Sequence, residues 1–391
     1  MAGTSLSERR LTPWEATSLT VGAGVGAGIM AVPYLAERVG ALGLAVILPL
    51  AWAASALVHL MLAEVALRTG RPLQVVELLR LYVLRGRVGR HLVWPVFGLL
   101  ALAFLANLAA YVAGAGEIVA ALTGAPSRLA EALVYAASAG VVFFGLKAVG
   151  VAERYGAALL VGLVAAIAIG AAFAPARAPL GAPTGGGGAA AALALYAMVM
   201  YAYWTFYSVP QVVQGLMPDA RAAVRAIAVG LAVNGALTAA VAAVALRVSR
   251  PVTEVAIHGI AEAIGPWAGT AGQLLIVLAF VTSYWSVSLA LADIVRERTG
   301  APRPAAWLLA TLPSLLALWL GAWHFLAWLR LAAGATALVL ALVTLPMYLA
   351  ARREGAVDPG WTLGRWGGPV ALAAALVALV LMAVGSLWPT A

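Results

Sequence analysis

Long apolar runs separated by short polar segments dominate the chain from about residue 13 to its end. A helix needs about 20 predominantly apolar residues to cross the ~30 Å hydrocarbon core of a bilayer. Runs of this length predict eleven transmembrane helices, at residues 13–36, 41–68, 92–121, 129–149, 153–174, 190–217, 222–248, 268–296, 304–322, 324–350 and 368–388. Only Gly321, His324 and nearby tryptophans separate the ninth run from the tenth. The pattern therefore predicts an all-α polytopic membrane protein.

The cationic residues alternate with these runs and set the expected orientation. They gather in every second loop, at residues 9–10, 68–90, 147–154, 221–225, 296–303 and 352–365. Lys and Arg are enriched in cytoplasmic loops, so the pattern places the N-terminus in the cytoplasm and, after eleven helices, the C-terminus outside. The first twelve residues contain no small-residue cleavage site and are expected to remain as a cytoplasmic tail. We expect a multi-pass protein of the cell (inner) membrane, with the basic loop 69–90 on anionic lipid.

Composition narrows the class of protein further. Of 391 residues, 64% are hydrophobic and 10% are charged, which lies far from soluble globular proteins. The net charge of +9 is explained by the cytoplasmic loops and gives no reason to expect a nucleic-acid partner. The chain has no Cys, its four His are scattered, and the glycines at 185–188 lack the Lys and Ser/Thr of a phosphate-binding loop. We therefore expect neither an enzyme nor a resident cofactor.

A linker rich in Pro and Gly divides the chain near its middle. Residues 176–189 separate a first part, 1–175, with helices one to five, from a second part, 190–350, with helices six to ten. Residues 351–391 would add a cytoplasmic loop and helix eleven. If a five-helix unit is repeated, its odd number of helices forces the second copy into the opposite orientation. The organisation therefore predicts an inverted repeat of five plus five helices with one extra C-terminal helix.

Two of the expected helices contain residues that interrupt regular structure. Helix one carries the stretch "VGAGVGAGIMAVPYLAERVG", and helix six carries Ser208 and Pro210 after a polar, aromatic run. Unpaired backbone groups are tolerated at membrane depth only where protein, ligand or water satisfies them. Glycines four apart are also typical of close helix packing, so this alternative stays open. Breaks in corresponding helices of two halves, however, indicate the substrate site of a secondary transporter.

Three stretches resemble the amino acid/auxin permease family of the amino acid, polyamine and organocation superfamily, and its bacterial aromatic (hydroxy) amino acid permeases in particular. They are "GAGVGAGIMAVPY" at 22–34, "SVPQVVQGLMPDARAAVRAIAVG" at 208–230 and "VTSYWSVSLALADIVRE" at 281–297. The resemblance implies the inverted-repeat fold with broken helices one and six, and amino acid transport by alternating access with a coupling ion.

The resemblance also implies positions for substrate and ion. The substrate would lie on the two breaks, at Gly24, Val25, Gly26, Gly28, Thr205, Phe206, Tyr207 and Ser208. A sodium ion, where the fold has one, would lie between the helix-one break and helix eight, at Gly22, Val25, Thr282 and Ser283. The bulky pair Phe206 and Tyr207 departs from the small or His-Gly element of similar permeases. That departure fits a small apolar substrate no worse than an aromatic one.

Several other residues are candidates by position alone. Asn107 and Tyr111 share a face of helix three, and Ser286 lies on the face of Ser283, so all three face the expected path. Ionisable groups within a membrane are functional candidates. For gating or proton coupling these are Glu64, which could instead pair with Arg68, and His59, Arg330 and Asp293. No acidic residue or Lys is expected in the middle of helix five, which removes one way to replace sodium by a protein charge.

These observations predict a symporter of amino acids, small neutral or aromatic, driven by a sodium or proton gradient. Its only expected bound ion is sodium. The alternative is a membrane receptor subunit of the same fold that senses an amino acid without net transport. A divalent metal as cargo is disfavoured, because neither break contains the Asp, Asn, Met or His that a metal carrier of this superfamily would use.

Overall fold

The computed structural model describes residues 10–26, 28–176, 188–249, 251–252, 256–321 and 343–387. In these residues all regular structure is helical, and eight helices are long and apolar enough to cross a membrane. The all-α polytopic fold class is therefore confirmed, although the count of eleven helices is not. Arg330, most of the expected helix 324–350 and most of the linker 176–189 lie outside the described residues.

The first expected helix is broken at its glycines. Helix α1 (Pro13–Gly24) begins with a capping box, in which Thr12 and Glu15 bind each other's backbone N–H groups. It ends at Gly24, and the next helix, α2 (Gly28–Thr69), begins four residues later. A kink at Gly40, with φ of 84°, divides α2 into the second half of helix one and the whole of helix two. Pro33, a few residues after the glycines, lies inside α2.

The rest of the first half corrects two expectations. It continues with α3 (Val75–Tyr82), α4 (Gly86–Thr123), α5 (Ser127–Phe143) and α6 (Leu146–Phe173). The segment 69–90, expected as a basic loop, contains the short helix α3. The boundary between helices four and five was expected at 149–153, but the chain turns at Gly145, with φ of 86°. Glu153 consequently lies two turns inside α6 rather than at its start.

The second half repeats the pattern of a broken helix followed by long ones. Its elements are α7 (Ala189–Ala202), the 3₁₀ turn η2 (Phe206–Ser208), α8 (Val209–Leu216), α9 (Ala220–Val248), α10 (Ile257–Ile264), α11 (Pro266–Thr299) and α12 (Arg303–Leu320). A helix at 343–354, a turn η3 (Gly364–Gly367) and α14 (Pro369–Leu387) follow. The break spans residues 203–208, so Pro210 does not interrupt the helix as expected but stands in the first turn of α8, where its missing N–H has no cost.

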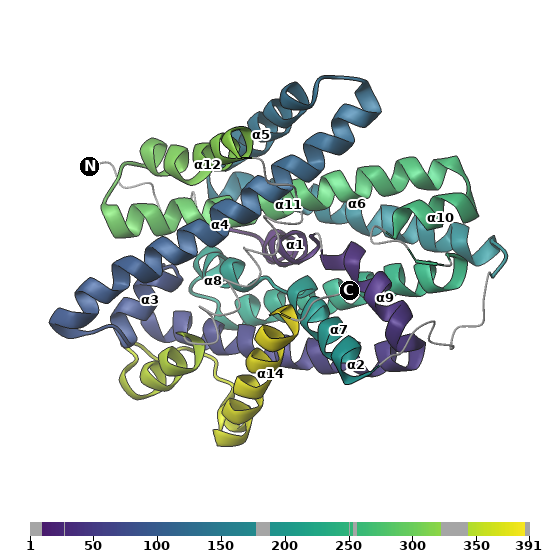
Figure 1. Cartoon of the computed structure of the whole chain (residues 1–391). Coiled ribbons are helices and arrows are strands. Elements are labelled where there is room, and N and C mark those ends of the chain that lie inside the picture. Colours follow the sequence, from purple (N-terminus) through teal and green to yellow (C-terminus); the bar gives the residue numbers. More distant parts are fainter. Residues whose placement is uncertain are drawn as a thin grey trace.

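The broken helix α1 lies in the middle of the molecule (Figure 1). It packs against α6, α8, α9 and α11, while α2 packs against α7 and α9. Helices α5 and α12 pack against each other and against α4 and α11, and α14 covers α7 and α2 from the outside (Figure 1). Large apolar side chains such as Phe173 and Leu320 are almost fully exposed, as expected for surfaces that face lipid. The buried polar residues include several around the break in α1, such as Asn234, Thr282 and Ser283.

Candidate functional site

The carbonyl groups freed by the break in α1 are bound by hydroxyl groups of neighbouring helices. Thr282 and Ser283 of α11 both donate to the carbonyl oxygen of Gly22, each at 3.2 Å. The hydroxyl of Tyr207, from the second break, donates to the carbonyl oxygen of Ala23 at 3.0 Å. All three hydroxyl-bearing residues are buried. The break is thus satisfied by side chains, as membrane depth requires.

Five oxygen atoms converge between this break and α11. Ser283 Oγ also lies 3.5 Å from the carbonyl oxygen of Val25, and Thr282 Oγ1 lies 3.2 Å from the carbonyl oxygen of Ala279. Oxygens held about 2.4 Å from a hard cation at right angles to one another are about 3.4 Å apart. The separations of 3.2–3.5 Å therefore fit a cation of sodium size. Ala279 was not among the expected residues, because a backbone carbonyl one turn before Thr282 leaves no side-chain signal.

Gly26 faces polar side-chain ends rather than packed backbone. A Cβ atom at this position would lie 3.1 Å from Ser283 Oγ and 3.7 Å from the hydroxyl of Tyr111. The ring of Tyr111 stacks on Phe280, with centroids 5.8 Å apart. The hydroxyl of Tyr201 donates to Asn107 Oδ1, 3.2 Å away. The structure thus brings Tyr111 to the break in α1, whereas Asn107 binds Tyr201 of α7, a residue that was not expected.

The other glycines of the stretch permit close packing. A Cβ at Gly24 would lie 2.0 Å from Nδ2 of Asn234 and 2.7 Å from Thr205, and one at Gly28 would lie 2.9 Å from the backbone of Ala202. Asn234 on α9 also donates to the carbonyl oxygen of Thr20 at 3.2 Å. The packing interpretation of the glycine stretch therefore holds at these two positions, while their backbone groups still belong to the break.

The second break is held by its own backbone and by aromatic stacking. Ser208 donates to the carbonyl oxygen of Thr205 through both N, at 2.9 Å, and Oγ, at 2.7 Å. Phe206 stacks on Trp204, and Tyr207 meets Phe104 edge to face. Thr205 Oγ1 is buried without a hydrogen-bond partner. All four residues expected at this break are buried, and Tyr207 contacts the first break directly.

His59 of α2 fixes the start of the second break. Its Nε2 atom accepts a hydrogen bond from the backbone N–H of Thr205 at 3.1 Å, and Nδ1 lies 2.6 Å from the carbonyl oxygen of Ser55. An acceptor at Nε2 and a donor at Nδ1 describe the neutral imidazole with its proton on Nδ1. In this conformation both ring nitrogens are occupied by backbone groups, so His59 positions the break rather than offering a site for a coupling proton.

We expect His59→Leu to destabilise the protein by about 1–3 kcal/mol, because the buried N–H of Thr205 loses its acceptor. His59→Gln should lose less, since its amide oxygen can accept from the same N–H. The measurement is thermal unfolding of purified variants, with the exposed His91→Leu as the matched control. Equal unfolding temperatures for the His59→Leu and His91→Leu variants would contradict the role.

Glu153 is a buried acidic residue two turns inside helix five, for whose middle we expected no acidic residue or Lys. Its side chain is fully buried, and Ser286 donates to Oε1 at 3.0 Å. A Cβ at Gly22 would lie only 1.8 Å from Glu153 Oε2, so the carboxyl group fills the space beside the break. The sequence interpretation placed Glu153 at the first residue of helix five. The helix instead begins directly after Gly145, so Glu153 lies inside it.

Of the expected gating residues, Glu64 and Asp293 are described and both form ion pairs. Glu64 accepts hydrogen bonds from Arg68 Nε at 2.9 Å and from the backbone N–H of Leu363 at 2.9 Å. Asp293 pairs with Arg296, three residues further along α11, at 3.0 Å. The pairing of Glu64 with Arg68, considered as the alternative to proton coupling, is therefore present.

The short helix α3 joins the end of α11. Arg298 of α11 lies 2.9 Å from the carboxyl group of Glu77, and its guanidinium lies 4.9 Å from the ring centroid of Trp94. The backbone N–H of Gln74 donates to Glu297 Oε2 at 2.9 Å. The basic loop is thus tied to the helix that carries Thr282 and Ser283, a connection that run length alone could not reveal.

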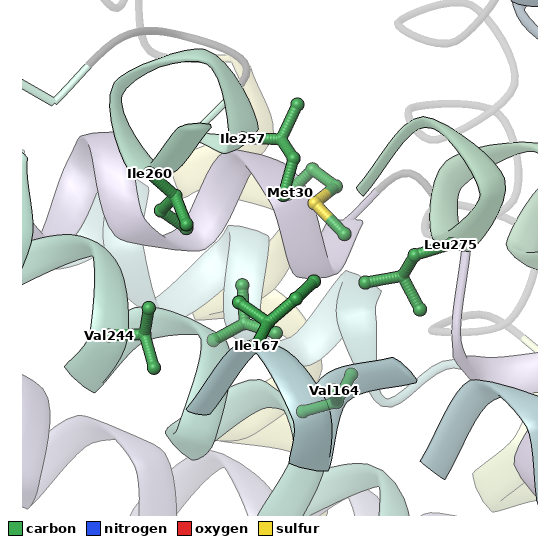
Figure 2. A pocket seen from close by; sticks show the side chains of 8 residues that line it. Met30, Val164, Ile167, Val244, Ile257, Ile260 and Leu275 are labelled. Carbon is green, nitrogen blue, oxygen red and sulfur yellow. The ribbon is translucent and has the colours of Figure 1, made fainter. Parts of the chain in front are cut away.

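On the α2 side of the break the space is closed by apolar side chains. A small pocket near the start of α2 is lined by Met30, Val164, Ile167, Val241, Val244, Ile257, Ile260 and Leu275 (Figure 2). Ile257 and Ile260 come from the short helix α10, which also packs closely against Gly272 of α11. Apolar side chains of α2, α6, α9, α10 and α11 therefore meet at this pocket.

Comparisons with known proteins found a matching family and a solved structure of similar fold. A family model described as the tryptophan/tyrosine permease family matches residues 10–386. Among solved structures, the chain is similar to Mhp1, described as a nucleobase-cation-symport-1 family transporter in a closed conformation with bromovinylhydantoin bound. The TM-score is 0.70 at 16% identity, covering 99% of this chain and 92% of that chain. A comparison with curated proteins gave no match. The likeness establishes a transporter fold with an inverted repeat.

Proposed function

Because the chain belongs to the tryptophan/tyrosine permease family, we propose that it carries an aromatic amino acid across the membrane together with a cation. The resemblance inferred from the three sequence stretches is confirmed by that membership. The protein is a multi-pass membrane transporter and not an enzyme. Its substrate is a small molecule and its surroundings are lipid.

The observation that carries the proposal is the contact between the two breaks, where Tyr207 donates to the carbonyl oxygen of Ala23 and Thr205 packs on Gly24, next to Gly26. The half-helix α2 begins beside this glycine, and the N-terminus of a helix favours a carboxylate. The hydroxyl groups of Tyr111 and Ser283 lie close to the same position. A substrate carboxylate at the start of α2 would place its ammonium group near the freed carbonyl groups, as in other transporters with broken helices.

Aromatic side chains near the breaks favour an aromatic substrate over a small neutral one. Tyr111 and Phe280 stack on one side, and Phe104 and Tyr207 meet edge to face on another. Rings of this kind bind a further aromatic ring with offset or edge contacts. We therefore infer tryptophan or tyrosine as substrate, with the small neutral amino acids as the competing class.

The coupling ion proposed is sodium, bound by the carbonyl oxygens of Gly22, Val25 and Ala279 and the hydroxyls of Thr282 and Ser283. Their separations fit a cation of that size. We further propose that the N-terminus and the basic loops face the cytoplasm across the cell membrane and that the C-terminus lies outside. The charges at residues 68–90 then meet anionic lipid.

The proposal is tested by the unfolding temperature of the purified protein with a panel of amino acids, each in sodium and in potassium salt. A ligand bound only by the folded state stabilises it, by about 2.7 kcal/mol at one hundred times its dissociation constant. We expect tryptophan or tyrosine to stabilise the protein more in sodium than in potassium, and to accumulate in proteoliposomes under an inward sodium gradient.

Other outcomes assign other functions. Stabilisation without uptake into liposomes would indicate a sensor of amino acids. Stabilisation by alanine or serine but not by tryptophan or tyrosine would show that the substrate is a small neutral amino acid. If no amino acid changes the unfolding temperature, amino acid transport is wrong.

A further inference from the structure

We propose that Glu153 supplies the negative charge of the cation site beside the break in α1, and that the site thereby selects a monovalent cation. The inference rests on the proposed function, because it concerns the ion that would be coupled to transport. It adds a residue of α6 to a site otherwise formed only by neutral oxygen atoms of α1 and α11.

The first step is the position of the carboxyl group. Glu153 Oε2 lies 1.8 Å from where a Cβ of Gly22 would be, so it is in contact with the α carbon of Gly22. Standard bond lengths then place Oε2 within about 6 Å of the carbonyl oxygen of Gly22. That oxygen accepts hydrogen bonds from both Thr282 and Ser283. The carboxyl group therefore lies next to the five converging oxygens.

The second step is the unsatisfied atom. Glu153 is fully buried, Oε1 accepts from Ser286, and Oε2 has no hydrogen-bond partner. Ser286 lies one turn after Ser283 on α11, so it turns the carboxyl group toward the helix that carries the two hydroxyl ligands. A buried charge without a partner is costly. A cation held by the neighbouring oxygens is the partner that would compensate it.

The third step is the absence of a protein cation for this role in the part of the chain that the structure describes. No basic side chain there forms an ion pair with Glu153. Lys147, two turns earlier on α6, pairs with Glu15 at 2.6 Å. Arg154 is turned to the ring of Tyr155, 4.7 Å from its centroid. On α11, Asp293 already pairs with Arg296 at 3.0 Å, two turns beyond Ser286.

The fourth step is the charge balance of the occupied site. One carboxylate with neutral carbonyl and hydroxyl oxygens gives zero net charge with a monovalent cation and a net positive charge with a divalent one. An uncompensated charge in a buried site is strongly unfavourable. The glycine at 22 is needed for this arrangement, because any side chain there would displace the carboxyl group.

The size of the electrostatic contribution follows from the distance. Two unit charges about 6–8 Å apart at an effective dielectric constant of about 20 interact strongly enough to change a dissociation constant about 30- to 100-fold. We expect Glu153→Gln to weaken cation binding by at least tenfold. The substitution preserves the shape of the side chain and an oxygen that can accept from Ser286, so it removes the charge with little effect on packing.

The experiment is a sodium titration of the unfolding temperature of the purified full-length protein at fixed pH. Choline chloride keeps the ionic strength constant, and no amino acid is present. The wild type should be stabilised with a half-saturating sodium concentration that rises at least tenfold in Glu153→Gln. Ser286→Ala, which keeps the charge but loses the orienting hydrogen bond, should give a smaller rise. Glu117→Gln, which neutralises an exposed carboxylate, should match the wild type.

Several results would overturn the inference. Equal half-saturating concentrations for wild type and Glu153→Gln would show that the charge is irrelevant to the cation. A wild type that responds to pH but not to sodium would place a proton on Glu153 instead. If sodium has no effect while tryptophan or tyrosine still stabilises the wild type, this inference fails and amino acid binding stands. If neither sodium nor any amino acid stabilises it, both proposals fail.

Discussion

Gly26→Leu is expected to abolish amino acid uptake and leave the protein folded. The new side chain would begin 3.1 Å from Ser283 Oγ and 3.7 Å from the hydroxyl of Tyr111, and its branched end would fill the space between them. Both neighbours are ends of side chains, which can shift, so the fold should tolerate the change. The substrate loses that space. We expect uptake in proteoliposomes to fall at least tenfold, which corresponds to about 1.4 kcal/mol or more of binding free energy.

The control is Gly98→Leu, because a Cβ at that exposed position on α4 has no atom within 4 Å. It carries the same change of residue without entering the site and should retain normal uptake. The second readout is thermal stabilisation by tryptophan or tyrosine, which should disappear in Gly26→Leu and persist in the control. Normal uptake by Gly26→Leu would rule out Gly26 as part of the substrate path and with it the proposed site.

The sequence predicts the broken helices well, because their signal is local. The glycines at 22–28 have to interrupt a helix or pack closely, and the structure uses them for both purposes. The two hydroxyls at Thr282 and Ser283 are adjacent in the sequence and reach one carbonyl oxygen across the interface. Run length also identifies the long helices. It cannot identify α3 or α10, since eight residues are too few to cross a membrane.

The burial of Glu153 was missed, although a helical projection of α6 from its true start would have indicated it. On α6 the buried positions recur every three or four residues and are otherwise apolar or glycine: Leu146, Val149, Gly150, Gly156, Ala157, Leu160, Val164, Ile167 and Ala171. Glu153 is the one charged residue on that face, whereas Arg154 and Tyr155 lie off it. Placing the helix start at Gly145 would have revealed it. The contact of His59 with Thr205, in contrast, joins residues 146 positions apart and needs the fold.

The second large effect is expected at Glu64, where substitution should cost stability. Its carboxyl group is fully buried and accepts hydrogen bonds from Arg68, from the Tyr348 hydroxyl at 3.2 Å and from the backbone N–H of Leu363 at 2.9 Å. These partners come from α2, the helix 343–354 and the loop before η3. The carboxylate therefore ties the end of α2 to the C-terminal part of the chain. Removing one member of a buried ion pair costs about 3–5 kcal/mol; the partial exposure of Arg68 places the expected loss for Glu64→Leu near the lower limit.

The matched control for Glu64 is Glu354→Leu, because Glu354 pairs with Arg85 where both side chains are about half exposed. An exposed pair contributes about 0–1 kcal/mol, so this variant should unfold at nearly the wild-type temperature. A further variant, Glu64→Gln, tests Glu64 as a proton-coupling residue. If Glu64 only holds the C-terminal segment against α2, the Glu64→Gln protein that remains folded should show the same pH dependence of uptake as the wild type. The opposite result would be a Glu64→Gln protein with wild-type stability whose uptake no longer responds to a proton gradient. In that case the carboxylate would act in proton coupling and not in holding the C-terminal segment against α2.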